Sequence, residues 1–489
     1  MPPTVTILQP RLRLDDPHDC TDANDVLAVF DAIFDGLVRY GRIGGFVSGL
    51  ANEWQVSADA RHWTFTLREG LTFHDGSPCD AQAVCLSLRR MARPDKGHTL
   101  GAPGVWHQYL GDAVIEATDR LTVQIHLSKP IADLLDILVY GYVVSPSALD
   151  RYESGDTTLP VGTGPYRVTD VVEGQEIRLQ RFDGWHGVAP ANDSICFKLE
   201  PDAAKRLALL QSGKAQVANS LDFRASKALE DDGGFTRIVS LVPVAIIYLF
   251  NAARGPLADP RIRKALNLAV DRQTLIANVV HGAAQPLTGF VSPVHFGSML
   301  PTDAGPDLET ARRLIVEAGY ADGLVIEVDC PTRLPDEAAA LTAAVAEQLS
   351  AIGVSLNVHL HEDREAYAHR VRLSKVRDMC VFDSSPLSTF RVLAEKIDAR
   401  VEGSWWLGFH NGEVETLLDE ARRTTDVAAR EDIYRQAYQK LQADPAWFYL
   451  YNPLRVTGLS GSRPNWRMRS DGVLDVTALP AFGLRESQL

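Results

Sequence analysis

The sequence has no uninterrupted apolar run of the roughly 18 residues that a membrane-spanning helix needs. It also has no Lys/Arg-rich run. Its 49 basic residues are fewer than its 63 acidic ones, and the formal net charge is -14. We therefore expect neither nucleic acid nor an anionic membrane as a partner of the bulk surface. The first residues, MPPTVTILQPRL, contain no basic and apolar export signal. This start fits either a cytoplasmic protein or a chain whose signal has been removed.

Motifs for catalysis and cofactor binding are missing as well. There is no G-x-x-x-x-G-K-[ST], no H-E-x-x-H and no G-x-S-x-G. GTGPYR begins like a dinucleotide fingerprint, but Arg167 occupies the third glycine position. The six cysteines are dispersed without a C-x-x-C pair, which leaves both disulfides and free thiols open. We expect no cofactor and no catalytic residue.

Strand and helix patterns are both abundant. Alternating apolar residues predict strands at TVTILQ, WTFTLRE, RLTVQIHL, EIRLQRF and SICFKLE. One long helix is predicted over DPRIRKALNLAVDRQTLIANVVHG, with Asp259 as its cap, Pro260 in its first turn and Gly282 as its stop. LETARRLIVEAG, EVETLLDEARR and AAREDIYRQAYQKLQ also have helical spacing. This mixture predicts the α/β class.

The stretch LTFHDGSPCD places a histidine beside an aspartate, as in some active sites. Asp75-Gly76 favours a tight turn, because glycine accepts positive φ. Asp80 can cap the helix that follows. We interpret the stretch as a turn between a strand and a helix, with His74 bonded to nearby backbone.

Many ordered motifs resemble the family 5 solute-binding proteins of ABC importers. They include VFDAIFDGLVRY, GLANEWQVSADARHWTF, VGTGPYRV, RFDGWHG, LLQSGKAQVA and YLFNAARGPLADPRIRKALNLAVDRQTLI, and they run from about residue 25 to 455. The resemblance implies a type II periplasmic-binding-protein fold, in which two α/β lobes close on a ligand by a hinge motion, with one inserted domain. Mapped onto this chain, lobe I is 1–42, 160–242 and 456–489, the inserted domain is 43–159, and lobe II is 243–455.

The same resemblance implies a periplasmic receptor, expected to be a monomer, that passes a small-molecule ligand to an ABC permease in the membrane. An opine, a small glycoside, an amino-acid derivative or a short peptide would suit it. The alternative within the family is an oligopeptide or metal-chelate receptor. From other classes, a hydrolase with a carboxylate and a histidine in a cleft and a cytoplasmic binding protein are the less favoured hypotheses.

CVFDSSPLSTF holds the first candidate ligand residues, Asp383, Ser384 and Ser385. Ser384 or Ser385 before Pro386 is also suited to cap a helix. In peptide-binding family members this region resembles Asp-Tyr-x-Asp-Pro, whose first Asp holds the ligand's α-amine. Asp383 matches that Asp, whereas Ser384 replaces the Tyr and no second Asp precedes Pro386. The resemblance therefore implies an acidic pole but argues against an ordinary peptide.

Aromatic rings are the second group of candidates. Trp405 and Trp406 lie in EGSWWLGFHNG among small residues, where one ring is expected in the core and the other stacked on the ligand. Trp106 and His107 in VWHQYL either line a cleft or pack inside. The remaining candidates follow strands at the two ends of the chain: Arg11, Asp15, Tyr451 and Asn452.

His359 and His361 share one face of a predicted strand, SLNVHLHED. Two such histidines can bind one metal ion, but neither a cysteine nor a third histidine is near in sequence. We interpret them as a solvated strand face and predict no metal site.

Overall fold

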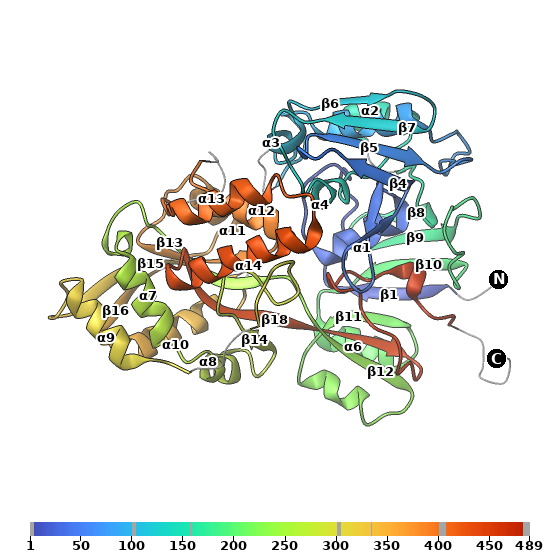
Figure 1. The fold of residues 1–489 in the computed structure, drawn as a ribbon. Helices are drawn as coiled ribbons and strands as arrows, with labels where there is room; N and C mark the ends of the chain where they lie inside the picture. The colour runs from blue at the N-terminus through green and yellow to red at the C-terminus, as the bar shows by residue number, and fades with distance from the viewer. Residues whose placement is uncertain are drawn as a thin grey trace. The chain divides into compact units, whose positions relative to one another are not determined.

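The computed structural model describes residues 4–99, 104–156, 159–300, 305–333, 335–400 and 407–482. The chain forms two compact units: unit 1 is Met1–Ser240 with Arg455–Leu489, and unit 2 is Leu241–Leu454. Both units combine helices with β-sheet (Figure 1), which confirms the α/β class. The further division of unit 1 into a lobe and an inserted domain stays a prediction. None of the helices in these ranges is long and apolar enough to cross a bilayer.

The main sheet of unit 1 is built around β1, a short apolar strand parallel to both of its neighbours, with Ile7 opposite Phe197 and Val217. Its strands are β8 (Tyr166–Val172), β9 (Glu176–Arg181), β10 (Ser194–Leu199), β1 (Val5–Gln9), β11 (Val217–Leu221), the end of β18 (Trp447–Ser460) and β12 (Phe235–Leu241). The helices around it include α1 (Asn24–Ile33), α6 (Ala203–Gln211) and the 3-10 turns η1 (Ala225–Leu229) and η3 (Val476–Ala478). Gln9 therefore ends a central, buried strand.

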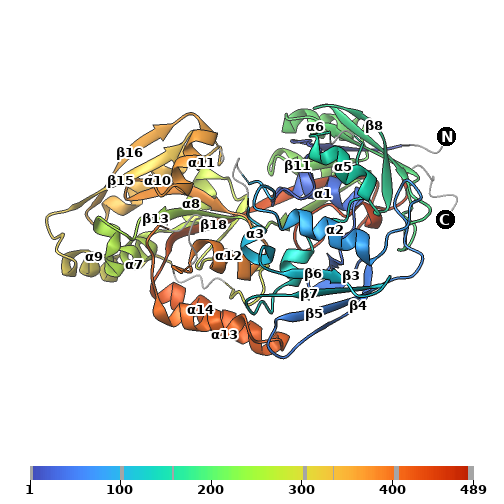
Figure 2. The same ribbon diagram turned by 90° about the horizontal axis from the view of Figure 1, so that it is seen from above.

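The second sheet of unit 1 is antiparallel, in the order β4 (Ala51–Val56), β5 (His62–Leu67), β7 (Thr122–His126) and β6 (Val114–Ala117). Helix α2 (Ala81–Met91) packs on β6 and β7 (Figure 2). Trp63, Phe65 and Leu67 form the buried face of β5, in line with the alternation that predicted a strand at WTFTLRE. The smaller elements are β2 (Val38–Tyr40), β3 (Phe46–Ser48), α3 (His107–Leu110), α4 (Leu135–Leu138) and α5 (Pro146–Glu153).

The turn predicted before α2 is confirmed. The Asp75 carboxylate accepts from the Ser77 amide, Gly76 has φ +82°, and the Asp80 carboxylate caps α2 by accepting from Ala83 N. His74 Nε2 donates to the Gly164 carbonyl at 3.0 Å, so this histidine has a structural partner.

The sheet of unit 2 has the order β16-β15-β17-β13-β18, and β14 adds to β18. Strands β15, β16 and β17 are parallel to one another, whereas β13 is antiparallel to β17. The strands are β13 (Ala245–Phe250), β14 (Ala284–Pro286), β15 (Leu324–Pro331), β16 (Val354–His361), β17 (Met379–Ser384) and the first part of β18. The helices are η2 (Pro256–Ala258), α7 (Pro260–Ala269), α8 (Arg272–Val279), α9 (Leu308–Glu317), α10 (Ala338–Ser350), α11 (Arg364–Arg372), α12 (Thr389–Lys396), α13 (Gly412–Ala421) and α14 (Val427–Ala443).

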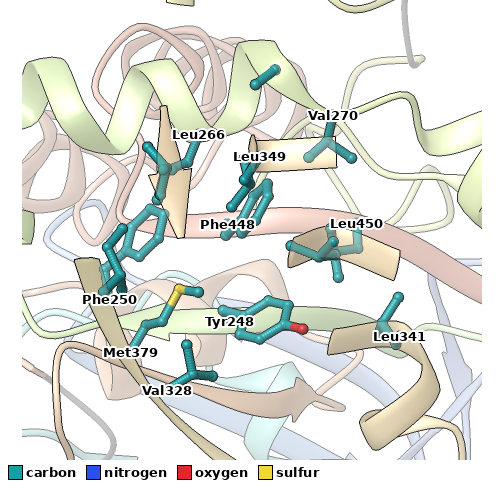
Figure 3. Packing of buried hydrophobic residues seen from close by; sticks show 14 of the residues in the cluster. Tyr248, Phe250, Leu266, Val270, Val328, Leu341, Leu349, Met379, Phe448 and Leu450 are labelled. Atoms are coloured by element: carbon teal, nitrogen blue, oxygen red, sulfur yellow. The ribbon is translucent and has the colours of Figure 1, made fainter. Parts of the chain in front are cut away.

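A cluster of buried, mostly aliphatic side chains forms the core of unit 2, with Tyr248, Phe250 and Phe448 among them (Figure 3). The Tyr248 and Phe250 rings lie 5.6 and 6.1 Å from that of Phe448, between their centroids. The Tyr248 hydroxyl hydrogen-bonds to Thr342 Oγ1 on α10 at 2.8 Å. The core thus joins the sheet to the helix that covers it.

The single helix predicted over residues 259–282 is wrong in one respect. Asp259 caps α7 as predicted, but that helix ends at Ala269. Asp271 then caps α8 by accepting from Thr274 N at 3.0 Å. Two short helices replace one long helix because a second capping aspartate lies inside the periodic pattern.

The six cysteines all lie in described parts of the chain, where they are buried and form no disulfide.

Candidate functional site

The carboxyl ends of β15, β16 and β17 meet at one edge of the sheet of unit 2, because these strands are parallel. Ligands of open α/β sheets commonly bind at this edge. Asp383 and Ser384 are the last two residues of β17, opposite Ile246 and Ala245. The edge therefore holds two of the residues that the sequence had singled out.

Asp383 does not stand alone at this edge. Its Oδ1 lies 3.6 Å from Nη2 of Arg364, and its side chain is 30% exposed. Arg364 is the first residue of α11, and its guanidinium lies over the ring of Phe382, 5.1 Å from the centroid. The predicted negative pole is thus one half of a charge pair that a ligand can still reach.

A second cation, Lys396, follows Asp383 in the sequence, whereas Arg364 precedes it. The Lys396 Nζ donates to Ser384 Oγ at 3.1 Å, and both residues are buried. The prediction that Ser384 or Ser385 caps a helix is wrong, because Ser388 caps α12 by accepting from Arg391 N. Ser384 remains in the β17 ladder instead, and Ser385 is half-buried beside it.

Tyr451 and Asn452 lie inside unit 2. The Tyr451 hydroxyl donates to Glu337 Oε1 at 2.6 Å, and only 1% of the residue is exposed. Burial and the Glu337 carboxylate raise the pKa of Tyr451 well above its usual range. Asn452 is fully buried; its Nδ2 donates to Val244 O, while its Oδ1 has no hydrogen-bond partner in the part of the chain that the structure describes. Tyr451 is therefore a core residue, and Asn452 keeps one acceptor unused.

Trp106 also belongs to the core, in unit 1. It is 0% exposed, it stacks on Tyr140 at 5.4 Å, and its Nε1 donates to His18 O at 2.9 Å. A ring with no exposed surface cannot be a cleft wall, which corrects that interpretation. The neighbouring His107 is exposed, and its Nδ1 donates to Ala92 O at 2.8 Å.

The loop after β1 carries Arg11 and Asp15. Asp15 is paired with Arg13 Nε at 2.9 Å. Arg11, which is 56% exposed, has its Nε 4.0 Å from Oδ2 of the buried Asp25. Asp15 thus pairs within its own loop, whereas Arg11 lies beside Asp25 of α1.

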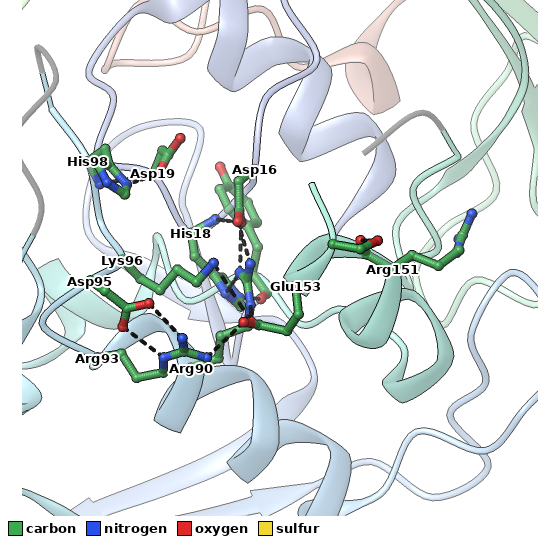
Figure 4. A network of polar contacts seen from close by, with 12 residues as sticks. Asp16, His18, Asp19, Arg90, Arg93, Asp95, Lys96, His98, Arg151 and Glu153 are labelled. Carbon is green, nitrogen blue, oxygen red and sulfur yellow. Dashed lines mark hydrogen bonds and ion pairs between the residues drawn. The ribbon is translucent and has the colours of Figure 1, made fainter. Parts of the chain in front are cut away.

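An ion network anchors the far end of this loop (Figure 4). The Arg90 guanidinium binds both oxygens of Asp16 and donates from Nε to Glu153 Oε1 at 2.6 Å. It also donates to Nδ1 of His18, whose Nε2 donates to Tyr142 O. Burial lowers the pKa of His18 to about 4. The network holds residues 16–18 against α2 and α5.

The sequence did not single out three residues that lie near Arg11. Gln9, at the end of β1, is fully buried; its Nε2 donates to Asp25 O, while its Oε1 has no partner in the described ranges. Asp25 Oδ1 is buried and unpartnered in the same sense. Arg455 lies close enough to Asp25 and Arg11 for both charges to act on its pKa, which burial lowers. A glutamine ending an apolar strand was the one visible sequence signal.

Trp405 and Trp406 lie outside the described residues, so the stacking role stays a prediction. On β16, His359 Nε2 bonds to Glu327 and His361 Nε2 to Asp329, at 2.5 and 2.7 Å. No group of three metal-ligating side chains occurs among the residues that the structure describes.

Comparison with known proteins identifies relatives over 63–89% of this chain. The glutathione-binding protein GsiB of Pectobacterium atrosepticum is 28% identical over 449 residues, which cover 89% of this chain and 85% of that protein. GsiB of Salmonella paratyphi A is 33% identical over 315 residues, covering 63% of this chain and 60% of that protein.

Solved structures show the same fold. The binding protein AgaA of A. tumefaciens R10, in complex with agropinic acid, matches with a TM-score of 0.79 and 22% identity over 97% of each chain. The ABC transporter substrate binding protein CtaP of Listeria monocytogenes matches with a TM-score of 0.82 and 18% identity over 98% of each chain. The two-lobed binding-protein fold is thereby confirmed.

Residues 45–386 match the model of the bacterial extracellular solute-binding proteins, family 5. This match covers more than half of the sequence. The chain therefore belongs to family 5 of the bacterial extracellular solute-binding proteins of ABC transporters.

Proposed function

We propose that this chain is the periplasmic receptor of an ABC importer, which captures one small polar ligand by hinge closure and passes it unchanged to a membrane permease. Family membership supports this proposal, because the named relatives are binding proteins. Only a ligand that binds the closed conformation better than the open one can drive such a closure. No bond of the ligand needs to be made or broken.

The observation that carries the proposed ligand class is the charge pair at the end of β17. Asp383 is partly exposed and offers an acceptor to a ligand ammonium group, while Arg364 beside it offers donors to a carboxylate. Charge-assisted contacts of both signs suit a zwitterionic ligand. An amino-acid derivative fits best, in the range from an opine to a short or modified peptide.

Mass spectrometry of the small molecules released from the purified, denatured protein tests this function. We expect one predominant amino-acid-derived compound, and calorimetry with that compound should show one site per chain. A ligand at 100 times its Kd stabilises the folded state by about 2.7 kcal/mol, so thermal unfolding should shift measurably. Recovery of a chemically altered compound after incubation, or a lack of any retained or binding compound of this class, would contradict the proposal.

A further inference from the structure

Gln9, Arg11, Asp25 and Arg455 form a polar cluster in unit 1, here called the Gln9 cluster. Two of its acceptors, Gln9 Oε1 and Asp25 Oδ1, are buried without a hydrogen-bond partner within the described ranges. Both residues are more than nine-tenths buried, with exposed fractions of 0% and 2%. Leaving a buried acceptor unpaired costs about 1–3 kcal/mol. Because Gln9 Nε2 donates to the Asp25 carbonyl, the two residues are neighbours, and unpaired acceptors on both of them indicate a missing donor.

The two cations of the cluster, half-buried Arg455 and exposed Arg11, differ from the buried Arg90 and Arg469 of unit 1. Arg90 and Arg469 are each held by carboxylates at hydrogen-bonding distance. Half-buried Arg455 lies on β18 next to Val456, which pairs with Leu221 of β11, the strand beside β1. Its guanidinium has no hydrogen bond or ion pair with any residue that the structure describes, and the charge of Asp25 raises its pKa against the lowering effect of burial. Arg11 approaches the same carboxylate at 4.0 Å without a hydrogen bond, and its side chain is 56% exposed. Two guanidinium groups therefore have donors to spare.

The chemistry of the cluster selects its occupant. A metal ion is disfavoured, because the two acceptor atoms lie beside two positive charges. Guanidinium groups bind a carboxylate well, often through two parallel hydrogen bonds. The two free acceptors require N–H or O–H donors. An amino-acid unit supplies a carboxylate and an N–H group one carbon apart.

We propose that the Gln9 cluster is a ligand subsite that binds a carboxylate through Arg455 and Arg11, and the neighbouring N–H group through Gln9 Oε1 and Asp25 Oδ1. This proposal rests on the proposed function and narrows it to ligands that end in a free amino-acid carboxylate.

Acid and blocked forms of the same compound test the subsite. Calorimetry would compare glutathione with its glycyl ethyl ester, and the dipeptide Met-Leu with Met-Leu amide. We expect at least one free acid to bind wild type at least about 30-fold more tightly than its blocked form, as loss of a buried charge partner implies. Arg455→Gln should weaken binding of the free acid by a similar factor and leave the affinity for the blocked form unchanged.

Further variants separate the subsite from general effects. Arg11→Gln changes a side chain that is 56% exposed, and it should reduce the same acid preference if Arg455→Gln fails to fold. Asp25→Asn places a donor where the ligand N–H would bind and should weaken both forms. Arg178→Gln removes an exposed arginine of β9 and should change nothing.

Each result has one meaning. If the acid and blocked forms bind wild type equally, or if both Arg455→Gln and Arg11→Gln retain the acid preference, the subsite is wrong while the proposed function stands. If none of the four compounds binds wild type, the subsite proposal fails, and the mass spectrometry of the retained compound decides separately whether the proposed ligand class holds.

Discussion

At the scale of single residues, Asp383 is the clearest candidate ligand contact in unit 2. We predict that Asp383→Ala lowers the affinity for the retained ligand by about 2–5 kcal/mol, because it leaves the ligand cation without its counter-charge. Calorimetry with the compound identified by mass spectrometry measures the loss. The double variant Asp383→Ala/Arg364→Ala should lose less than the sum of the two single changes, because the side chains are neighbours.

The control for Asp383 is Asp183→Ala, at an aspartate of unit 1 whose side chain is 90% exposed. It should leave affinity unchanged. If wild type and Asp383→Ala bound the ligand with equal affinity, Asp383 would not be a ligand contact.

Tyr451 should behave in the opposite way. Because its hydroxyl is bonded to Glu337 inside unit 2, Tyr451→Phe leaves that carboxylate with one partner fewer. We predict a loss of about 1–3 kcal/mol in the free energy of unfolding, with ligand affinity almost unchanged. Urea denaturation and calorimetry separate the two quantities. Tyr320→Phe, at a half-buried tyrosine of the same unit, is the control, and weaker binding without loss of stability would contradict this assignment.

At the scale of elements, the break between α7 and α8 depends on Asp271. Its carboxylate accepts from both the amide and the hydroxyl of Thr274, at 3.0 and 2.7 Å. We predict that Asp271→Ala lowers the free energy of unfolding by about 1 kcal/mol, the usual value of an N-cap. Urea titration of Asp271→Ala against Gln273→Ala, an exposed position in α8, measures it. If Asp271 did not stabilise α8 as its N-cap, Asp271→Ala and Gln273→Ala would be equally stable.

Local patterns predicted the elements whose signals do not depend on distant residues. β1, β5 and α9 match their periodicity, and α9 ends where Gly319 takes φ +97°, as expected of a terminal glycine. The α7–α8 break was missed because an apolar pattern continues through it while a second cap competes. The periodicity of apolar residues indicates which face of a helix is buried. It does not indicate where the helix ends, because a cap depends on a local hydrogen bond.

The candidate site was harder to predict than the fold. Asp383 could be found because it ends an apolar strand, yet its partner Arg364 comes from α11 and is brought near only by folding. Trp106 was ambiguous because an indole suits a core and a cleft equally, and only its burial separates the two. Gln9 and Asp25 could be identified only from the structure, in which Gln9 Oε1 and Asp25 Oδ1 have no hydrogen-bond partner among the described residues.

At the scale of the whole molecule, each unit contains a buried neutral histidine. Burial lowers the pKa of His18 in unit 1 and of His295 in unit 2 from 6.5 to about 4. Above pH 6.5 both the folded and unfolded states leave these histidines neutral. Between pH 6.5 and 4 only the unfolded chain takes up the protons, so the free energy of unfolding falls by up to about 1.4 kcal/mol per pH unit for each histidine.

We therefore predict that the protein loses stability between pH 6.5 and 5, before most carboxylates are protonated. Urea denaturation at a series of pH values measures the slope. His295→Gln should reduce the slope by the share of one histidine, since His18 still contributes, whereas His410→Gln, at an exposed histidine, should leave the slope unchanged. A free energy of unfolding that stays constant over this range in wild type would refute the prediction.

Strand β18 begins in unit 2 and ends in unit 1, where Leu459 pairs with Val217. Unit 2 is therefore one continuous stretch of chain, while unit 1 needs segments from both ends of the sequence. During synthesis, every residue of unit 2 leaves the ribosome before the last strand of unit 1 does. Unit 2 can thus complete its sheet while unit 1 still waits for its final strand. A chain that ended at Leu454 would contain all of unit 2 but would lack the part of β18 that pairs with β11, so one edge of β11 would stay open to pairing with another chain.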